Sequence, residues 1–273
     1  MPVDIRPIQT HQEYRAVEDL QRAVWDLDDA EIVPDHLLLT AAKNGGLLLG
    51  AFQGERLLGF VFGFPGVTAA GQLKHCSHMA GVAPEYQDGG LGYRLKLAQR
   101  QHVLAQGIEL ITWTYDPLES RNAYLNLHKL GATSRTYLRD LYGSMRDSLN
   151  AGMPSDRLEV AWHLNSSPVV RRLQGGGTRS LKQRRAAGAV VLVGPEPGAE
   201  STDPEPALRR GAPVLFPVPP DIQALKALNL PEALAWRQYL RDLFEGAFGA
   251  GYEARDLVLE GGQGYYLLER AQQ

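Results

Sequence analysis

Residues 82–99 read VAPEYQDGGLGYRLKLAQ, and three glycines stand where a stretch typical of a strand gives way to an amphipathic basic helix. The first N–H groups of a helix have no intrahelical partner, and the positive end of the helix dipole lies beside them. Glycine at positions 89, 90 and 92 leaves out the Cβ atoms that would keep a phosphate away from these donors. The stretch therefore predicts an anion-binding turn, with glycine serving turn geometry alone as the alternative.

Two common nucleotide-binding motifs do not fit this turn. A dinucleotide-binding G-x-G-x-x-G counted from Gly90 needs a third glycine where Leu95 stands, and the Gly-Lys-Ser/Thr of a P-loop is absent. The pattern that fits is Gln-x-x-Gly-x-Gly at residues 87–92, directly after VAPEY. In this pattern the turn resembles the loop with which the GNAT superfamily of N-acyltransferases binds the pyrophosphate of acyl-CoA.

The hydrophobic periodicity around the turn predicts an α/β fold whose element order is similar to that of the GNAT family. Strands are expected at 3–8, 47–53, 57–64, 72–83, 108–115, 132–139 and 158–164, and helices at 11–27, 34–43, 89–106 and from Asp116-Pro117 to Gly131. The helix after the turn is expected to bury a face formed by Leu91, Leu95, Ala98 and Ala105. The resemblance covers about the first 165 residues, and it implies a mixed sheet in which two neighbouring strands splay apart around the cofactor.

The resemblance also implies which residues hold the cofactor. Pantetheine would bond to the backbone of the strand that ends at Val82, the pyrophosphate would sit on the glycine turn, and the later helix would contribute asparagine side chains. The cofactor-binding residues assigned in this way are Ala80, Gly81, Val82, Gln87, Asp88, Gly89, Gly90, Leu91, Gly92, Tyr93, Asn122 and Asn126. The cofactor is expected to be acetyl-CoA or another acyl-CoA.

Two side chains are candidates for proton transfer. His78 precedes Val82 by four residues, where some arylalkylamine-type family members carry a histidine, and its ordinary pKa suits removal of a proton near neutrality. The acid is assigned to Tyr124, because the family's usual tyrosine position holds Leu127 here. A hydrogen-bonded core histidine and a packing aromatic are the structural alternatives for these two residues.

The neighbourhood of His78 does not favour a metal site. His75 is expected on the opposite face of the strand, so that only Cys76 and His78 share a face, and no third ligand is spaced near them. No metal is therefore expected.

The chain beyond residue 165 has a different texture. Segments 171–188 and 194–213 are rich in glycine, proline and charge and are expected to be loops around a strand at 189–194. A strand at 213–218, helices at 221–228 and 231–248, and a hairpin turning at 261–264 follow. The basic run formed by Arg171, Arg172, Arg179, Lys182, Arg184 and Arg185 lacks interleaved aromatics, and it favours a solvated linker over a nucleic-acid arm.

These observations divide the chain into three parts. Residues 1–165 form the expected acyl-CoA-binding domain, 166–187 a linker, and 188–273 a small αβ subdomain. The subdomain is interpreted as a partial GNAT-like half that covers the acceptor side or forms a homodimer edge, or as an αβ appendage of unrelated origin.

Composition limits the class of protein. The 273 residues are 44% hydrophobic and 22% charged, as in globular proteins, and the net charge of -3 argues against nucleic-acid binding through a broad basic face. The single cysteine, the polar opening MPVDIRPIQT and the absence of a long apolar run favour a cytoplasmic protein without a membrane partner.

The sequence therefore predicts an acyl-CoA-dependent N-acyltransferase. It would transfer an acetyl or succinyl group to the primary amine of a small molecule or amino acid by direct attack on the thioester. The alternative is a non-catalytic acyl-CoA-binding sensor that kept the glycine turn and lost its proton-transfer groups.

Overall fold

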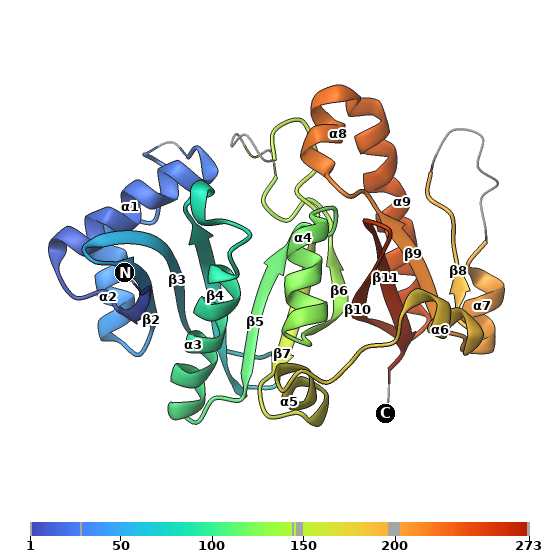
Figure 1. Ribbon diagram of the computed structural model, residues 1–273, viewed down its shortest axis with the longest axis horizontal. Coiled ribbons are helices and arrows are strands. Elements are labelled where there is room, and N and C mark those ends of the chain that lie inside the picture. The colour runs from blue at the N-terminus through green and yellow to red at the C-terminus, as the bar shows by residue number, and fades with distance from the viewer. Residues whose placement is uncertain (1, 28, 144, 146–149, 196–202, 272–273) are drawn as a thin grey trace. The chain divides into compact units, whose positions relative to one another are not determined.

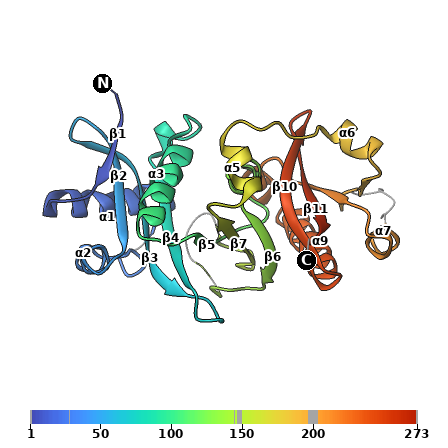
Figure 2. The same cartoon turned by 90° about the horizontal axis from the view of Figure 1, so that it is seen from below.

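The computed structural model describes residues 2–27, 29–143, 145, 150–195 and 203–271. The chain divides into two compact units, and Figures 1 and 2 show their elements from two directions. Unit 1 comprises Met1–Trp113, Arg146–Ala151 and His163–Asn165, and unit 2 comprises Thr114–Met145, Gly152–Trp162 and Ser166–Gln273.

Unit 1 is built on an open mixed sheet in the order β1-β2-β3-β4-β5. Its strands are β1 (Asp4–Pro7), β2 (Leu47–Gln53), β3 (Arg56–Val67), β4 (Leu73–Val82) and β5 (Leu110–Tyr115), whose last two residues belong to unit 2. The first four strands pair antiparallel, and β4 pairs parallel to β5. The parallel pair requires a crossover connection, which the glycine turn and the following helix supply.

Helices cover both faces of the unit 1 sheet because successive strand residues point to opposite sides. On one face Leu48 and Phe52 pack in a core with helix α1 (His11–Trp25) and helix α2 (Asp35–Lys43). On the other face, Leu47 and Leu49 pack against helix α3 (Leu91–Ala105). Figure 2 shows these helices beside the strands that they cover.

The strands of unit 2 follow the order β7-β6-β10-β11-β9-β8. All neighbouring strands in this order pair antiparallel except β8 and β9, which are parallel. The strands are β6 (Thr133–Leu138), β7 (Arg157–His163), β8 (Val190–Val191), β9 (Val214–Val218), β10 (Tyr252–Glu260) and β11 (Gln263–Arg270). Phe216, Phe244 and Tyr266 form the aromatic centre of its core.

The helices of unit 2 include one with unusual hydrogen bonding. Helix α4 (Ser120–Ala123) continues into a π-helical turn η2 (Tyr124–Lys129), in which the N–H of Leu130 bonds the carbonyl of Leu125. The other helices are α5 (Ser167–Leu173), α6 (Leu181–Ala186), α7 (Glu205–Arg210), α8 (Ile222–Leu228) and α9 (Leu230–Gly249).

The α/β fold predicted from the sequence is confirmed, and the two predicted loops are corrected. The first contains the last three residues of α5 and all of α6, and the second contains α7. Local capping explains helix α6, because Ser180 and Gln183 form a reciprocal capping box at its start. The predicted strand at 189–194 is shorter than expected, since only Val190–Val191 pair with β9.

The basic run is also corrected, because two of its arginines bind a buried carboxylate instead of solvent. Arg172 and Arg184 both donate to Asp256 of β10, which is 1% exposed. Helices α5 and α6 are therefore tied to the C-terminal hairpin by charge.

The boundary between the two compact units differs from the domain boundary predicted at residue 165, because unit 2 already begins at Thr114. Strand β6 pairs with β10 through Ser134 and Ala254, so the hairpin of β6 and β7 shares a sheet with the C-terminal hairpin. This pairing joins residues far apart in sequence, and local periodicity does not reveal it.

Candidate functional site

Strands β4 and β5 separate after a short paired segment. They pair only at His75 with Ile111 and at Cys76 with Thr112, whereas β4 keeps its pairing with β3 as far as Val82. The edge of β4 from Ser77 to Val82 is therefore released from its parallel neighbour. We call this released edge the splay edge.

A β-bulge lies at the beginning of the splay edge. Phe62 pairs with Met79 and Gly63 pairs with Ser77, which leaves His78 as an extra residue on β4. The bulge places His78 and Met79 on the same face of the sheet, the face of α1 and α2, although the two residues are consecutive. The sequence predicted His78 as a candidate base, and it gave no sign of the bulge.

The ring of His78 is exposed to solvent at one side and contacts aromatic rings at the other. Its centroid lies 5.9 Å from that of Phe62 and 5.9 Å from that of Phe64. Partial burial among these rings lowers the pKa of His78. The imidazole is consequently neutral at pH 7, which is the form that accepts a proton.

The glycine turn lies on the surface at the end of the splay edge. A short 3-10 helix (Pro84–Tyr86) leads into it, Gln87, Asp88 and Gly89 are exposed, and Gly90 adopts a left-handed φ of 75° as the N-cap of α3. No side chain caps this helix, and a Cβ built on Gly90 would meet no atom within 4 Å. The turn therefore presents backbone amides to solvent at the positive end of a 15-residue helix.

The remaining residues assigned to the cofactor in unit 1 surround the turn. Gln87 donates its side-chain amide to the carbonyl of Val82 at 3.1 Å, which holds the turn against the end of β4. Ala80 is exposed on the splay edge, whereas Gly81 and Leu91 are buried. Gly92 and Tyr93 are half-buried in the first turn of α3.

Behind the splay edge lies a buried polar cluster that the sequence analysis missed. Nζ of Lys96 on α3 lies 2.8 Å from Oγ of Ser77 and 3.1 Å from Oε1 of Gln99, and it stands 3.8 Å from the ring centroid of Trp113. The Nε2 of Gln99 also lies 3.2 Å from Nε2 of His75. His75 therefore lies on the face of the sheet that α3 covers. This face is opposite to that of His78, as predicted.

Burial decides the electrostatics of this cluster. Lys96 is 4% exposed, and removal from water lowers its pKa to about 7. Burial first, and then repulsion from Lys96, lowers the pKa of His75 to about 4. Leu91, Leu95 and Val103 form the apolar part of the buried face of α3, and Lys96 and Gln99 form its polar part, whereas the predicted Ala105 is exposed.

The predicted acid and asparagines belong to unit 2. Tyr124 begins the π-helical turn and stacks on His128, with ring centroids 4.5 Å apart. His128 places its Nδ1 2.9 Å from Oδ1 of the buried Asp256. Asn122 is exposed, whereas Asn126 is 3% exposed and lies inside the unit.

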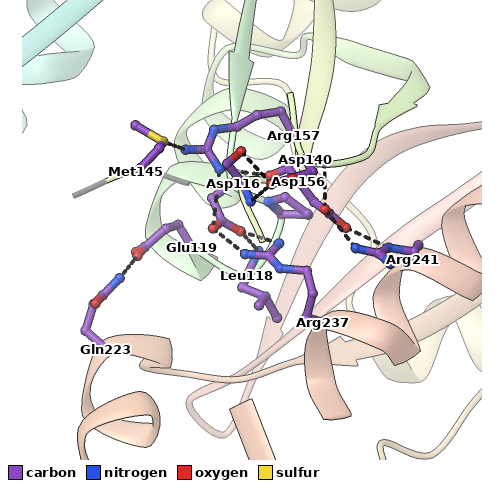
Figure 3. A network of polar contacts seen from close by, with 12 residues as sticks. Asp116, Leu118, Glu119, Asp140, Met145, Asp156, Arg157, Gln223, Arg237 and Arg241 are labelled. Atoms are coloured by element: carbon purple, nitrogen blue, oxygen red, sulfur yellow. Dashed lines mark hydrogen bonds and ion pairs between the residues drawn. The ribbon is translucent and has the colours of Figure 1, made fainter. Parts of the chain in front are cut away.

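Unit 2 also contains a network of buried charges that Figure 3 shows in detail. Arg237 donates two hydrogen bonds to Asp116, at 2.8 and 2.6 Å, and Arg241 donates two to Asp156, both at 2.9 Å. Arg157 lies 3.7 Å from the same Asp116. These carboxylates are thus matched by guanidinium groups, and the network joins α9 to the segments that flank α4 and β7.

Other site types were sought in the described parts of the chain. A cavity of about 590 Å³ in unit 2 is lined by residues of α7, α9 and β11, and none of the predicted site residues lines it. Among the described residues, no three His, Cys, Asp or Glu side chains are grouped so that they could hold a metal ion. No described helix combines the length and the apolar character needed to cross a membrane.

Comparison with known proteins finds solved structures of similar fold and no match by sequence. No protein-family model and no curated protein matches the chain. The ribosomal-protein-S18-alanine N-acetyltransferase from Escherichia coli is 15% identical, over 61% of this chain and 96% of that chain, with a TM-score of 0.47. A GNAT-family acetyltransferase from Streptococcus pneumoniae is 14% identical, over 59% and 98% of the two chains, with a TM-score of 0.48.

A third solved structure, aminoglycoside 6'-acetyltransferase type Ii, is 18% identical, over 60% of this chain and 99% of that chain, with a TM-score of 0.47. The fold is similar to that of GNAT acetyltransferases. The GNAT-like part spans about three fifths of the chain and nearly all of each solved structure. Identities at this level describe a fold and carry no information on the acceptor.

Proposed function

We propose that the chain is an acyl-CoA-dependent N-acyltransferase that acylates a primary amine. The observation that carries the proposal is the exposed, uncapped glycine turn at the start of α3, directly at the end of the splay edge. The turn offers amides and a helix dipole to a diphosphate, and the splay edge offers unpaired backbone groups to an extended amide-containing arm. CoA carries these two groups in the same order, because its pyrophosphate would bind the turn and its pantetheine arm, which contains amides, would bind the splay edge.

The reaction follows from these positions. With the pyrophosphate on the turn and pantetheine along the splay edge, the thioester lies toward the bulge at His78. The amine nitrogen attacks the thioester carbonyl, and neutral His78 accepts the proton that the amine loses. Backbone N–H groups released by the bulge would bind the oxyanion. Tyr124 is proposed as the acid that protonates the leaving thiolate.

The transferred acyl group would be acetyl or succinyl. A succinyl carboxylate needs a cation, for which the sequence offers Arg121, Arg135 and Arg139, and the last two pair with Glu253 and Glu245. The acceptor would be the amine of a small molecule or an amino acid.

The test of the glycine turn is the variant Gly90→Glu, followed by calorimetric titration with CoA. The glutamate side chain enters open space, so the fold is expected to survive. Its charge repels the diphosphate, and the affinity for CoA should fall at least a hundredfold, which corresponds to about 3 kcal/mol. Gly90→Asn is a matched control for the left-handed backbone without the charge. Gly107→Glu is a second control, because Gly107 has the same φ of 75° and the same open surroundings at the other end of α3.

Both controls should retain CoA binding. Unchanged affinity in Gly90→Glu would remove the turn from the cofactor site.

A non-catalytic acyl-CoA sensor is the second candidate, and one observation favours it. Leu127, which occupies the position of the family's tyrosine, is fully buried and cannot donate a proton. A thiol-release assay with acetyl-CoA and succinyl-CoA against a panel of amines separates the two functions. Turnover with any acceptor rejects the sensor, and tight CoA binding without turnover rejects the enzyme.

A further inference from the structure

The ammonium group of Lys96 lies where β4 and β5 stop pairing. The last pair is Cys76 with Thr112, and the next residues along the two strands are Ser77 and Trp113. Nζ of Lys96 contacts both of them, at 2.8 Å from Oγ of Ser77 and 3.8 Å from the ring centroid of Trp113. Lys96 therefore spans the closed end of the splay.

Among the described residues, the buried ammonium group of Lys96 has no anionic partner. Its contacts there are the hydroxyl of Ser77, the amide of Gln99 and the ring of Trp113, all of which are neutral. Charged side chains are almost never fully buried unless paired, because the loss of hydration is costly. In the described part of unit 2, by contrast, the half-buried Asp116 and the buried Asp156 and Asp256 all pair with arginines.

A second group in the same cluster lacks a hydrogen-bond partner. Nδ1 of His75 bonds no atom of the described residues, and the residue is 0% exposed. When the side-chain amide of Gln99 donates to Nε2 of His75, the imidazole proton is on Nδ1 and stays unmatched. The cluster therefore holds an excess of donors and positive charge, as expected where an anion forms during function.

The expected anion follows from the proposed function, on which this inference rests. From Val82, beside the glycine turn, to Ser77 the splay edge contains six residues, and the five steps between them span roughly 17 Å at about 3.3 Å per residue. An extended pantetheine arm bridges a distance of that order, so its sulfur reaches the closed end. When the amine forms the new C–N bond, the C–S bond breaks and its electron pair stays on this sulfur.

We propose that Lys96, acting through Ser77, stabilises the sulfur of the departing CoA as a thiolate. Ser77 turns its hydroxyl proton from Gln99 to the sulfur, and the ammonium of Lys96 polarises that hydroxyl from behind. Lys96 is thus a positioning residue for the leaving group. The thiolate then takes its proton from the acid, for which Tyr124 is proposed, or from solvent as CoA leaves.

The test compares CoA with desulfo-CoA, which keeps the nucleotide and lacks the sulfur, by calorimetric titration at pH 7, where Lys96, with a pKa of about 7, is partly protonated before the ligand binds. The wild type should bind CoA about tenfold or more tightly than desulfo-CoA, the effect of a hydrogen bond to a charged group. In Lys96→Met the ratio of the two affinities should fall to about twofold or less. Methionine has a similar shape without charge and removes the cost of burying an unpaired charge, so the variant is expected to fold.

Arg94→Met is the matched control, because Arg94 is a cation on the exposed side of the same helix. Its loss can weaken CoA and desulfo-CoA alike, and it should leave their ratio unchanged. The wild type also provides a readout that needs no variant, since a bound thiolate adds an ultraviolet absorption band to the CoA complex that the desulfo-CoA complex lacks. That band should be present at pH 7 in the wild type and lost in Lys96→Met.

The outcomes separate this inference from the proposed function. Equal and tight binding of the two ligands by the wild type, without the thiolate band, overturns the role of Lys96 and leaves acyl-CoA binding intact. Failure of both ligands to bind overturns the proposed function itself. The other titratable groups near Lys96 are His75 on β4 and His102 on α3, and burial lowers the pKa of both, so neither supplies a competing charge at pH 7.

Discussion

At the scale of single residues, the pattern of the chain shows some candidate site residues and hides others. The place of Gly90 at the start of a helix was predictable, because a glycine cluster between a strand and a helix has few uses. His78 was predictable from its residue type and place, but the bulge that puts it beside Phe62 is a property of the pairing with β3. Lys96 escaped notice because lysine is usually exposed. A signal was present, since Gly92, Lys96, Gln99 and Val103 recur at helical spacing.

The role of His78 is tested by its effect on the pH dependence of the rate. Its pKa is lowered from the ordinary value of about 6.5, so the neutral base is fully present above that pH and is lost as the pH falls through the lowered pKa. The wild-type rate should therefore be flat above about pH 6.5 and decline in acid. In His78→Ala we expect a rate about a hundredfold lower, without that acid limb.

The control for this experiment is His36→Ala, in which an exposed histidine of α2 is removed. It should keep both the rate and the pH profile of the wild type. If His78→Ala also keeps the wild-type profile, His78 has no part in proton transfer.

At the scale of elements, the success of prediction depended on how local the determining interactions are. Alternating apolar residues and glycine stops placed the strands β1–β7 within a few residues of their observed bounds. Helices α5 and α6 were missed because they carry few apolar residues and are held by Asp256, 84 residues after Arg172 and 72 after Arg184. An ion pair across such a distance leaves no periodic trace in the sequence.

The contribution of these elements to stability is tested by Asp256→Asn. Hydrogen bonds and charge from His128 and Arg172 hold the pKa of Asp256 below its ordinary value despite burial, so the carboxylate is ionised at pH 7. Its removal leaves Arg172 and Arg184 beside a neutral amide, and we expect the free energy of unfolding in urea to fall by about 3 kcal/mol. Glu205→Gln, which breaks the exposed pair with Arg209, should change it by less than about 0.5 kcal/mol.

Equal small losses in the two variants would show that Asp256 does not anchor α5 and α6. A large loss in Asp256→Asn alone would assign the basic run a structural role.

At the scale of the whole chain, a pattern of elements occurs twice. The order β4-α3-β5-α4-β6-β7 is repeated by β8-α7-β9-α9-β10-β11 if the short helix α8 is set aside. In each set the first two strands are parallel and pair at two positions only. In the first set these positions are His75 and Cys76 of β4, and in the second set they are Val190 and Val191 of β8. Both sets end in an antiparallel hairpin. This repetition supports the proposal that the C-terminal part is a partial GNAT-like half.

The second set is not equipped to bind a second cofactor, and this leads to a prediction of stoichiometry. Its crossover helix α7 has six residues against fifteen in α3, and the sequence that precedes it, GPEPGAESTDP, carries Glu196, Glu200 and Asp203 in place of a glycine turn. A weaker helix dipole and added negative charge both disfavour a diphosphate. Calorimetric titration of the wild type with CoA should therefore give one site per chain, and Gly90→Glu should abolish the whole signal. Two sites, or half of the signal remaining in Gly90→Glu, would show that the second set binds CoA as well.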